Sequence, residues 1–405
     1  MSGLRLALCC KEVSRIQGSS IEDELNWAKI KTEMNIVFRA DASLEIGSGH
    51  VMRCLVLADA LADVGARCTF ICREHIGHLG AVIQQCGHDL RILPLHTDDQ
   101  ATTTNGTAHA HWLDASQEVD AEETLACLNN VQFEWMIVDH YGIDAQWEQR
   151  IREHIPNTFV IDDLADRPHL CDALLDQNLG KSIADYQGLI AASCRTFFGP
   201  HYALLAPVFL KERDASLARR KGRPARSILI TMGGVDKDDT SGWILRELKA
   251  CKLPEEVKIT VIMGRTAPWV ENVRRIAAEM PWKTEVFVDI QDMAARMSSA
   301  DLALGAAGST SWERCCLGLP SVMLVLAENQ APIAKALAAA GAAIVVDHRE
   351  PTAGVTLRNA MEQLVRDTTM RMQMSLAAAS ITDGGGAERV CTFLSRSLER
   401  VTGSK

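Results

Sequence analysis

Apolar positions along the chain gather into short runs that are separated by stretches with helical spacing. The first clear run begins at Met34 in MNIVFRAD, and residues 49–65 after it have the apolar spacing of a helix. The apolar stripe of that helix is Val51, Leu55, Ala58 and Leu61. Further runs are RCTFIC (67–72), DLRILP (89–94), WMIVDH (135–140) and TFVIDD (158–163). Such alternation predicts parallel strands joined by crossover helices that cover both faces of a sheet.

The alternation stops at residues 207–226 and then starts again. This segment, PVFLKERDASLARRKGRPAR, is basic, polar and weakly patterned, as is typical of an interdomain linker. New apolar runs follow in SILITMGG, VKITVIMG, TEVFVD, ADLALGAAG, SVMLVL and AAIVVD. We therefore predict an α/β protein with two tandem Rossmann-like, doubly wound domains whose active site lies in the cleft between them. The expected domains are 34–206 and 227–385, with the linker 207–226 between them and a C-terminal helix and tail at 386–405.

Residues 1–33 show no clear periodicity. We expect them to be a disordered N-terminal extension or sequence upstream of a natural start at Met34.

Composition narrows the class of protein. The 405 residues carry a formal net charge of −10 and no stripe of Lys and Arg, so a nucleic-acid partner is not expected. The longest apolar run, ALAAAGAAIVV (336–346), is too short to span a bilayer. Thirteen cysteines without regular spacing are typical of reduced thiols. We therefore expect a cytoplasmic protein without a stable membrane association.

The turn IGSGHVMRC (46–54) joins the first strand to the helix. It is not a dinucleotide fingerprint, because Met52 stands where the third glycine is needed, and no Gly-Lys-Ser/Thr follows for a P-loop. Imidazole is the natural general base near neutral pH, so His50 is a candidate catalytic base. The alternative is that His50 caps the helix or hydrogen-bonds the backbone. Asp41 could orient this imidazole or cap the turn, and the sequence leaves both open.

Two glycine turns in the second half end strands in the same way. In ADLALGAAGSTSWERCCLGLP (300–320), free N–H groups at a helix start would form an anion site. Glu313, one turn further on, could accept both hydroxyls of a ribose, or it could only favour the helix dipole. The turn in LITMGGVDKDD (229–239) brings the bare backbone of Gly233 and Gly234 to the same edge.

Polar clusters end several strands of the first half. They lie in VDHYGIDAQWEQRIR (138–152), VIDDLADRPHLCDALLDQN (160–178) and FFGPHYALLAPVF (197–209), and they could read the hydroxyls and amides of a sugar. Ordinary Asx turns are the alternative for each. His109 and His111 in ATTTNGTAHAHW (101–112) could ligate a metal, but we expect a solvated loop and no metal site.

Several of these segments together resemble one family. FRADASLEIGSGHVMRCLVLADAL, VDHYGID, VIDDLADR, CDALLDQN and ALGAAGSTSWERCCLGLP are similar to the hydrolases of pseudaminic acid biosynthesis. These hydrolases remove UDP from UDP-2,4-diacetamido-2,4,6-trideoxy-β-L-altropyranose. They have the glycosyltransferase-B fold, as does the N-acetylglucosaminyltransferase that makes the lipid II precursor. The resemblance covers about residues 34–390, and it implies a role in nonulosonic acid biosynthesis for flagellin or surface polysaccharide.

The resemblance assigns roles to residues of this chain. It implies that His50 is the catalytic base, that Glu313 binds the ribose, and that backbone near Val288 contacts uracil. The diphosphate would lie on Gly308, Ser309 and Thr310. The other expected substrate contacts are Arg39, Asp41, Gly47, Gly49, Asp139, Tyr141, Asp163, Gln177, Asn178, Gly233 and Gly234. The partners are then a UDP-linked diacetamido sugar and water, without a cofactor. One departure is Ala206 in YALLAP, where the family pattern has arginine.

Two other functions fit the same fold. A transferase would pass the sugar to an acceptor instead of water, and fold alone does not decide between them. Residues 34–200 lack the basic-rimmed apolar patch expected for a membrane acceptor. A nucleotide-sugar binder without catalysis would need neither His50 nor the polar strand ends.

Overall fold

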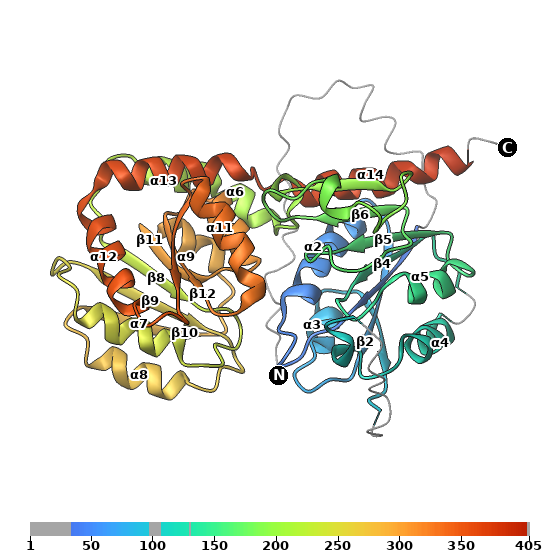
Figure 1. The fold of residues 1–405 in the computed structure, drawn as a ribbon, viewed down its shortest axis with the longest axis horizontal. Helices are drawn as coiled ribbons and strands as arrows, with labels where there is room; N and C mark the ends of the chain where they lie inside the picture. The colour runs from blue at the N-terminus through green and yellow to red at the C-terminus, as the bar shows by residue number, and fades with distance from the viewer. Residues whose placement is uncertain (1–33, 97–106, 129–130, 403–405) are drawn as a thin grey trace, which may run out of the picture.

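The computed structural model describes residues 34–96, 107–128 and 131–402, with side chains up to residue 396. Two α/β domains lie side by side in Figure 1, the first coloured blue to green and the second yellow to red. The predicted extension 1–33 lies outside the described residues, as does part of the loop 101–112.

The first domain is built on a parallel sheet of seven strands in the order β3-β2-β1-β4-β5-β6-β7. The strands are β1 Asn35–Ala40, β2 Arg67–Arg73, β3 Asp89–Leu93, β4 Trp135–Asp139, β5 Asn157–Ile161, β6 Ala173–Asp176 and β7 Arg195–Phe198. The helices are α2 Gly49–Asp63, α3 Gly80–Gln85, α4 Gln117–Cys127 and α5 Ala145–Arg152, with 3₁₀ turns η1 Ala110–Leu113, η2 Ile183–Tyr186 and η3 Pro200–Tyr202. Buried apolar clusters cover both faces of this sheet, as parallel strands require.

The second domain has a parallel sheet of six strands in the order β10-β9-β8-β11-β12-β13. The strands are β8 Ser227–Thr231, β9 Lys258–Met263, β10 Lys283–Val288, β11 Leu302–Ala306, β12 Ser321–Val325 and β13 Ala343–Asp347. The helices are α7 Thr240–Lys249, α8 Val270–Ala278, α9 Met293–Ser299, α10 Thr310–Cys316, α11 Ala331–Ala339, α12 Ala353–Arg366 and α13 Thr368–Ile381, with the 3₁₀ turn η4 Glu328–Gln330. The predicted fold class, two tandem doubly wound domains, is confirmed.

Strands β6 and β7 were not among the predicted strands. Each spans four residues, too few to show a period, and polar residues flank both. Their core positions, such as Leu174 and Leu175, are fully buried nonetheless.

The segment 207–226 is not a loosely patterned linker over most of its length. Helix α6 occupies Pro207–Arg219, beginning with proline at its first turn. Its basic side chains bind carbonyl groups of the second domain: Arg213 donates to the Ala379 carbonyl (2.6 Å), and Arg220 donates to that of Ala300 (2.8 Å). The basic side chains that suggested an interdomain linker therefore fix this segment to the second domain.

The last helix, α14 (Gly386–Thr402), returns to the first domain. Ala387, Val390, Cys391 and Leu394 join the core on the α2 side of the first sheet. Figure 1 shows the helix, in red, lying along the first domain. The two domains are thus connected by α6 and again by the segment leading into α14.

The strand orders place both predicted loops at topological switch points. In the first sheet the order in which strands are added reverses between the neighbours β1 and β4, and in the second sheet it reverses between β8 and β11. Ligands of open α/β sheets bind beyond the carboxyl ends of strands at such points. Residues 46–50 follow β1, while Gly233 follows β8 and Gly308 follows β11.

Candidate active site

A buried histidine–aspartate pair lies at the switch point of the first domain. Ala40 at the end of β1 pairs with Asp139 at the end of β4, and α2 begins just after β1. His50, in the first turn of α2, lies with its Nδ1 2.6 Å from Oδ1 of Asp139. The contact to a carboxylate assigns the ring proton to Nδ1. His50 is 8% exposed, and no described residue hydrogen-bonds its Nε2. In the neutral imidazole with its proton on Nδ1, Nε2 is an acceptor available to a ligand or water.

The turn before His50 is shaped by glycine. Gly47 has φ +81°, and its N–H donates to the Ser43 carbonyl at 2.9 Å. A side chain at this left-handed position would be strained. Gly49 is the first residue of α2, and a Cβ there would lie 3.7 Å from Ser309 Oγ in the second domain.

Arg53 is the main member of this site that we did not predict from the sequence. Its guanidinium donates to both oxygens of Asp139, from Nε at 2.6 Å and from Nη2 at 2.7 Å. Nη1 donates to Asp163 at 2.6 Å. Arg53 is three residues after His50, so both project from one face of α2. This spacing of three residues was the sequence feature that could have predicted Arg53 as a neighbour of His50.

Burial by itself would raise the pKa of Asp139, but Arg53 and His50 together hold that pKa far below the ordinary value. The carboxylate is therefore ionised throughout the physiological range. Because Arg53 neutralises it, Asp139 serves chiefly to fix the orientation and tautomer of His50.

Asp163 and Tyr141 extend the network. The Tyr141 hydroxyl donates to Oδ2 of Asp163 (2.6 Å), and the Tyr141 ring meets the edge of the His50 ring at 4.6 Å between centroids. Asn178 donates to the Asp163 backbone carbonyl at 3.2 Å and lies 3.3 Å from its carboxylate. These predicted site residues therefore lie together, around one carboxylate.

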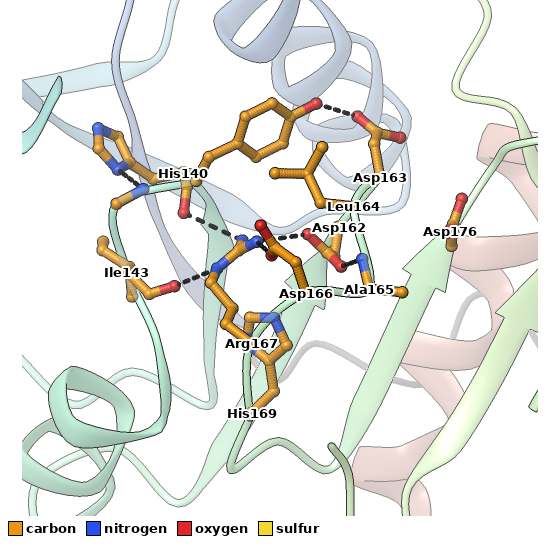
Figure 2. A network of polar contacts seen from close by, with 12 residues as sticks. His140, Ile143, Asp162, Asp163, Leu164, Ala165, Asp166, Arg167, His169 and Asp176 are labelled. Atoms are coloured by element: carbon orange, nitrogen blue, oxygen red, sulfur yellow. Dashed lines mark hydrogen bonds and ion pairs between the residues drawn. The ribbon is translucent and has the colours of Figure 1, made fainter. Parts of the chain in front are cut away.

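The guanidinium of Arg167 holds the loop that carries Asp163. In Figure 2, Arg167 lies between Asp162 and Asp166, while the Asp163 carboxylate points away from them. Arg167 also donates to the Ile143 carbonyl at 2.8 Å. Asp163 is thus held on a rigid loop at the end of β5.

Three predicted substrate contacts are bound to other residues of the first domain. Arg39 is fully buried, with Nη2 2.7 Å from Asp120, and it also pairs with Asp41. Asp41 accepts from the Arg73 backbone N–H at 2.7 Å and does not contact His50. The side chain of Gln177 accepts from the Leu204 N–H at 3.3 Å and is 3% exposed. All three side chains are buried and bound to other residues of the first domain.

The first glycine turn of the second domain lies against its neighbouring loop. Gly233 has φ +86°, and a Cβ on Gly264 would lie 1.9 Å from the Gly234 carbonyl oxygen. A Cβ on Gly234 would lie 3.4 Å from Ser48 Oγ of the first domain. Asp236 accepts from the first N–H groups of α7, at 2.9 and 3.0 Å. The start of α7 is therefore already occupied by a carboxylate.

The second glycine turn is open. The N–H groups of Gly308, Ser309 and Thr310 donate to no described residue, and a Cβ on Gly308 would meet nothing within 4 Å. Glu313 follows in α10, and its carboxylate accepts no hydrogen bond from the described residues; burial raises its pKa to about 7. Val288, at the end of β10, is half-buried.

The described residues contain neither a cluster of metal ligands nor a membrane-spanning helix. Within the described ranges, no group of three or more His, Cys, Asp or Glu residues could hold a metal ion. Instead of forming a metal pair, His111 lies 3.1 Å from Glu45, and His109 packs on Trp112 with 4.4 Å between ring centroids. No helix in the described part of the chain has the length and apolarity to cross a membrane.

The chain is similar to several known proteins. Residues 227–389 match the glycosyltransferase family 28 C-terminal domain. The chain is 26% identical to the UDP-2,4-diacetamido-2,4,6-trideoxy-beta-L-altropyranose hydrolase of Campylobacter jejuni over 308 residues, 76% of this chain and 97% of that protein. It is 24% identical to the spore coat polysaccharide biosynthesis protein SpsG of Bacillus subtilis over 368 residues, 89% and 98% of the two chains.

The fold also has solved relatives. MurG of Acinetobacter baumannii superposes with a TM-score of 0.63 at 17% identity, covering 90% of this chain and 99% of that one. The comparisons confirm the resemblance seen in the motifs and the glycosyltransferase-B fold.

Proposed function

We propose that the protein hydrolyses a UDP-linked 2,4-diacetamido-2,4,6-trideoxyhexose to UDP and the free sugar, in the cytoplasmic synthesis of a nonulosonic acid. Its hydrolase relative and its transferase-type second domain support the coarser part of this statement, an enzyme that acts on a UDP-sugar. The hydrolytic step rests on one observation, the His50–Asp139 pair with a free Nε2 at the switch point.

The pair can activate water. Asp139 holds the Nδ1 proton of His50, so Nε2 accepts a proton from a water molecule as the water oxygen attacks the anomeric carbon. The bond between that carbon and the phosphate oxygen breaks, and its electron pair leaves with UDP. The proton then passes from His50 to solvent. The products are a free reducing sugar, UDP and one proton, so the atoms and charges balance.

The second domain would hold the leaving group. The open N–H groups of Gly308, Ser309 and Thr310 are suited to the diphosphate, whose charge grows as the bond breaks. Glu313 can accept the ribose hydroxyls, and the backbone near Val288 can meet uracil. Gly49 contributes a further free N–H at the start of α2, where neither a capping side chain nor an acidic residue competes. The starts of α2 and α10 lie close together, since a Cβ on Gly49 would be 3.7 Å from Ser309 Oγ, and a diphosphate held there would be favoured by both helix dipoles.

A matched pair of variants tests this function. His88, like His50, is a buried histidine bound to an aspartate, with 2.8 Å from Nε2 to Asp59, but Asp59 lies in the second half of α2, away from the switch point. UDP release from the UDP-sugar is measured for His50→Gln and His88→Gln. We expect a loss of about 10²–10⁴-fold for the first variant and near wild-type turnover for the second.

The assay also separates the rival functions. UDP release that requires an added sugar acceptor would identify a transferase, which the family 28 domain would accommodate. Thermal stabilisation by the UDP-sugar without any UDP release would identify a binding protein.

A further inference from the structure

A group of aromatic rings stands beside His50 and plays no part in the histidine–aspartate pair. Trp112 stacks on Tyr141 with 5.6 Å between ring centroids and 23° between planes. His109 lies against both rings, 4.4 Å from Trp112 and 5.5 Å from Tyr141. The His50 ring meets Trp112 edge-on at 6.3 Å. The four rings therefore form one continuous surface that ends at the candidate base.

The turn that carries Trp112 is held in place. Leu113, the last residue of η1, is 1% exposed and packs into the core on the face of the sheet that α4 and α5 cover. His111 reaches Glu45 at 3.1 Å, in the loop that leads to Gly47. Asp114 then accepts from the His96 backbone N–H at 2.9 Å. These contacts fix the turn against the loop that presents His50.

Packing alone accounts for only part of the cluster. Tyr141 is 8% exposed, and its hydroxyl is already bound to Asp163. Trp112 and His109 remain half-buried, and the indole N–H of Trp112 donates to no described residue. Burial lowers the pKa of His109, against the pull of Asp166, so its ring is neutral at neutral pH. The exposed part of the cluster is thus an uncharged ring surface beside the reacting position.

We propose that Trp112 and His109 form the apolar wall of the sugar subsite and receive the C6 methyl group of the deoxysugar. This inference rests on the proposed function, because it assumes that the sugar lies between His50 and the UDP-binding loops. Ligand sites commonly combine an apolar or aromatic wall with a few fixed polar groups. Here the nearby carboxylates of Asp139 and Asp163 are taken up by Arg53 and Tyr141, so the rings supply the remaining recognition.

The consequence is a preference for a methyl over a hydroxymethyl at C6. A hydroxymethyl group against an uncharged ring surface would lose hydrogen bonds to water without replacement. Apolar surfaces discriminate such small differences by about 10–200-fold. We expect a preference near the lower limit, about tenfold, because both rings are half-buried.

Binding measurements on a variant that lacks the candidate base His50 test the proposed apolar wall independently of hydrolysis. In the His50→Gln background, calorimetry would give dissociation constants for UDP, for the UDP-diacetamido-trideoxyhexose and for its 6-hydroxy analogue. Trp112→Ala should reduce the preference for the 6-deoxy sugar from about tenfold to about twofold, with UDP binding unchanged. Trp112→Phe should keep most of the preference, because the phenyl ring preserves the apolar surface. Circular dichroism confirms that each variant is folded.

The outcomes separate this inference from the proposed function. If Trp112→Ala leaves the preference for the 6-deoxy over the 6-hydroxy sugar unchanged, the proposal that Trp112 contacts the C6 methyl group is wrong. An equal loss of affinity for UDP and for both sugars would also contradict it. If the wild-type protein releases no UDP, the hydrolase proposal fails. The dissociation constants still decide whether Trp112 contacts the sugar.

Discussion

Replacing Asp139 by asparagine should separate the orientation of His50 from the stability of the domain. The substitution keeps the shape of the side chain but removes the charge that holds His50 and Arg53. Asp120, in helix α4 of the same domain, offers a matched control: it is also fully buried, and it accepts from Arg39 at 2.7 Å and from Arg73 at 2.6 Å. Asp120 does not touch His50. Asp139→Asn and Asp120→Asn therefore remove equivalent buried carboxylates, of which one supports the candidate base.

The expected cost in stability is similar for both variants. Removing one partner of a buried ion pair costs about 3–5 kcal/mol. In Asp139→Asn the amide would retain one oxygen for Arg53, which also keeps Asp163, so we expect about 3 kcal/mol. The pKa of each carboxyl lies below its ordinary value, so each pair stabilises the native state fully above the unfolded pKa of ~3.9. That stability is lost as the pH falls, and comparisons belong at pH 7–8.

The assay combines urea unfolding with UDP release. Asp139→Asn should lose about 10²–10⁴-fold in turnover, since His50 no longer has a fixed tautomer, whereas Asp120→Asn should remain near wild type once folded. Equal turnover in the two variants would refute the reasoning, because Asp139 would then be only a structural residue.

Three further predictions concern the second domain and the cofactor requirement. Gly308→Ala should leave the free energy of unfolding within about 0.5 kcal/mol of wild type, because its Cβ would meet open space. The same Cβ would stand where the diphosphate is expected, so calorimetry should show weaker UDP binding. Gly264→Ala should lower the free energy of unfolding by about 1–3 kcal/mol through its clash with Gly234. Burial raises the pKa of Glu313 to about 7. The folded state therefore loses stability progressively as the pH rises from the unfolded pKa of ~4.3 to about 7. Glu313→Gln should therefore melt higher above pH 7 but bind UDP more weakly, and a lower melting temperature would contradict this. UDP release should survive exhaustive chelation, since the described residues offer no cluster of metal ligands; recovery of lost activity by a divalent cation would contradict it.

Local sequence was sufficient for the parts of the fold that depend on neighbours along the chain. The apolar stripe of residues 49–65 predicted α2, and Val51, Leu55 and Leu61 are buried as expected. The alternation around each domain likewise predicted the parallel sheets. The roles of individual site residues, including His50 and Glu313, stay predictions until they are assayed.

Pairings between distant segments could not be read in this way. Asp41 seemed a possible partner for His50 because it is near in sequence, but the actual partner is Asp139, 89 residues away. Only the pairing of β1 with β4 brings that carboxylate to α2. Arg39 likewise pairs with a distant residue, Asp120, which lies 81 residues away.

The central claim is tested most directly by the fate of oxygen in H₂¹⁸O. The UDP-diacetamido-trideoxyhexose is incubated with the wild-type protein and with His50→Gln, and the products are followed by ³¹P and ¹H NMR and by mass spectrometry. The account predicts that ¹⁸O enters the free sugar at C1 and that the released UDP carries none. It also predicts that His50→Gln forms both products much more slowly than the wild-type protein. Label in the UDP would show attack at phosphorus, and would contradict a water activated by His50 at the anomeric carbon.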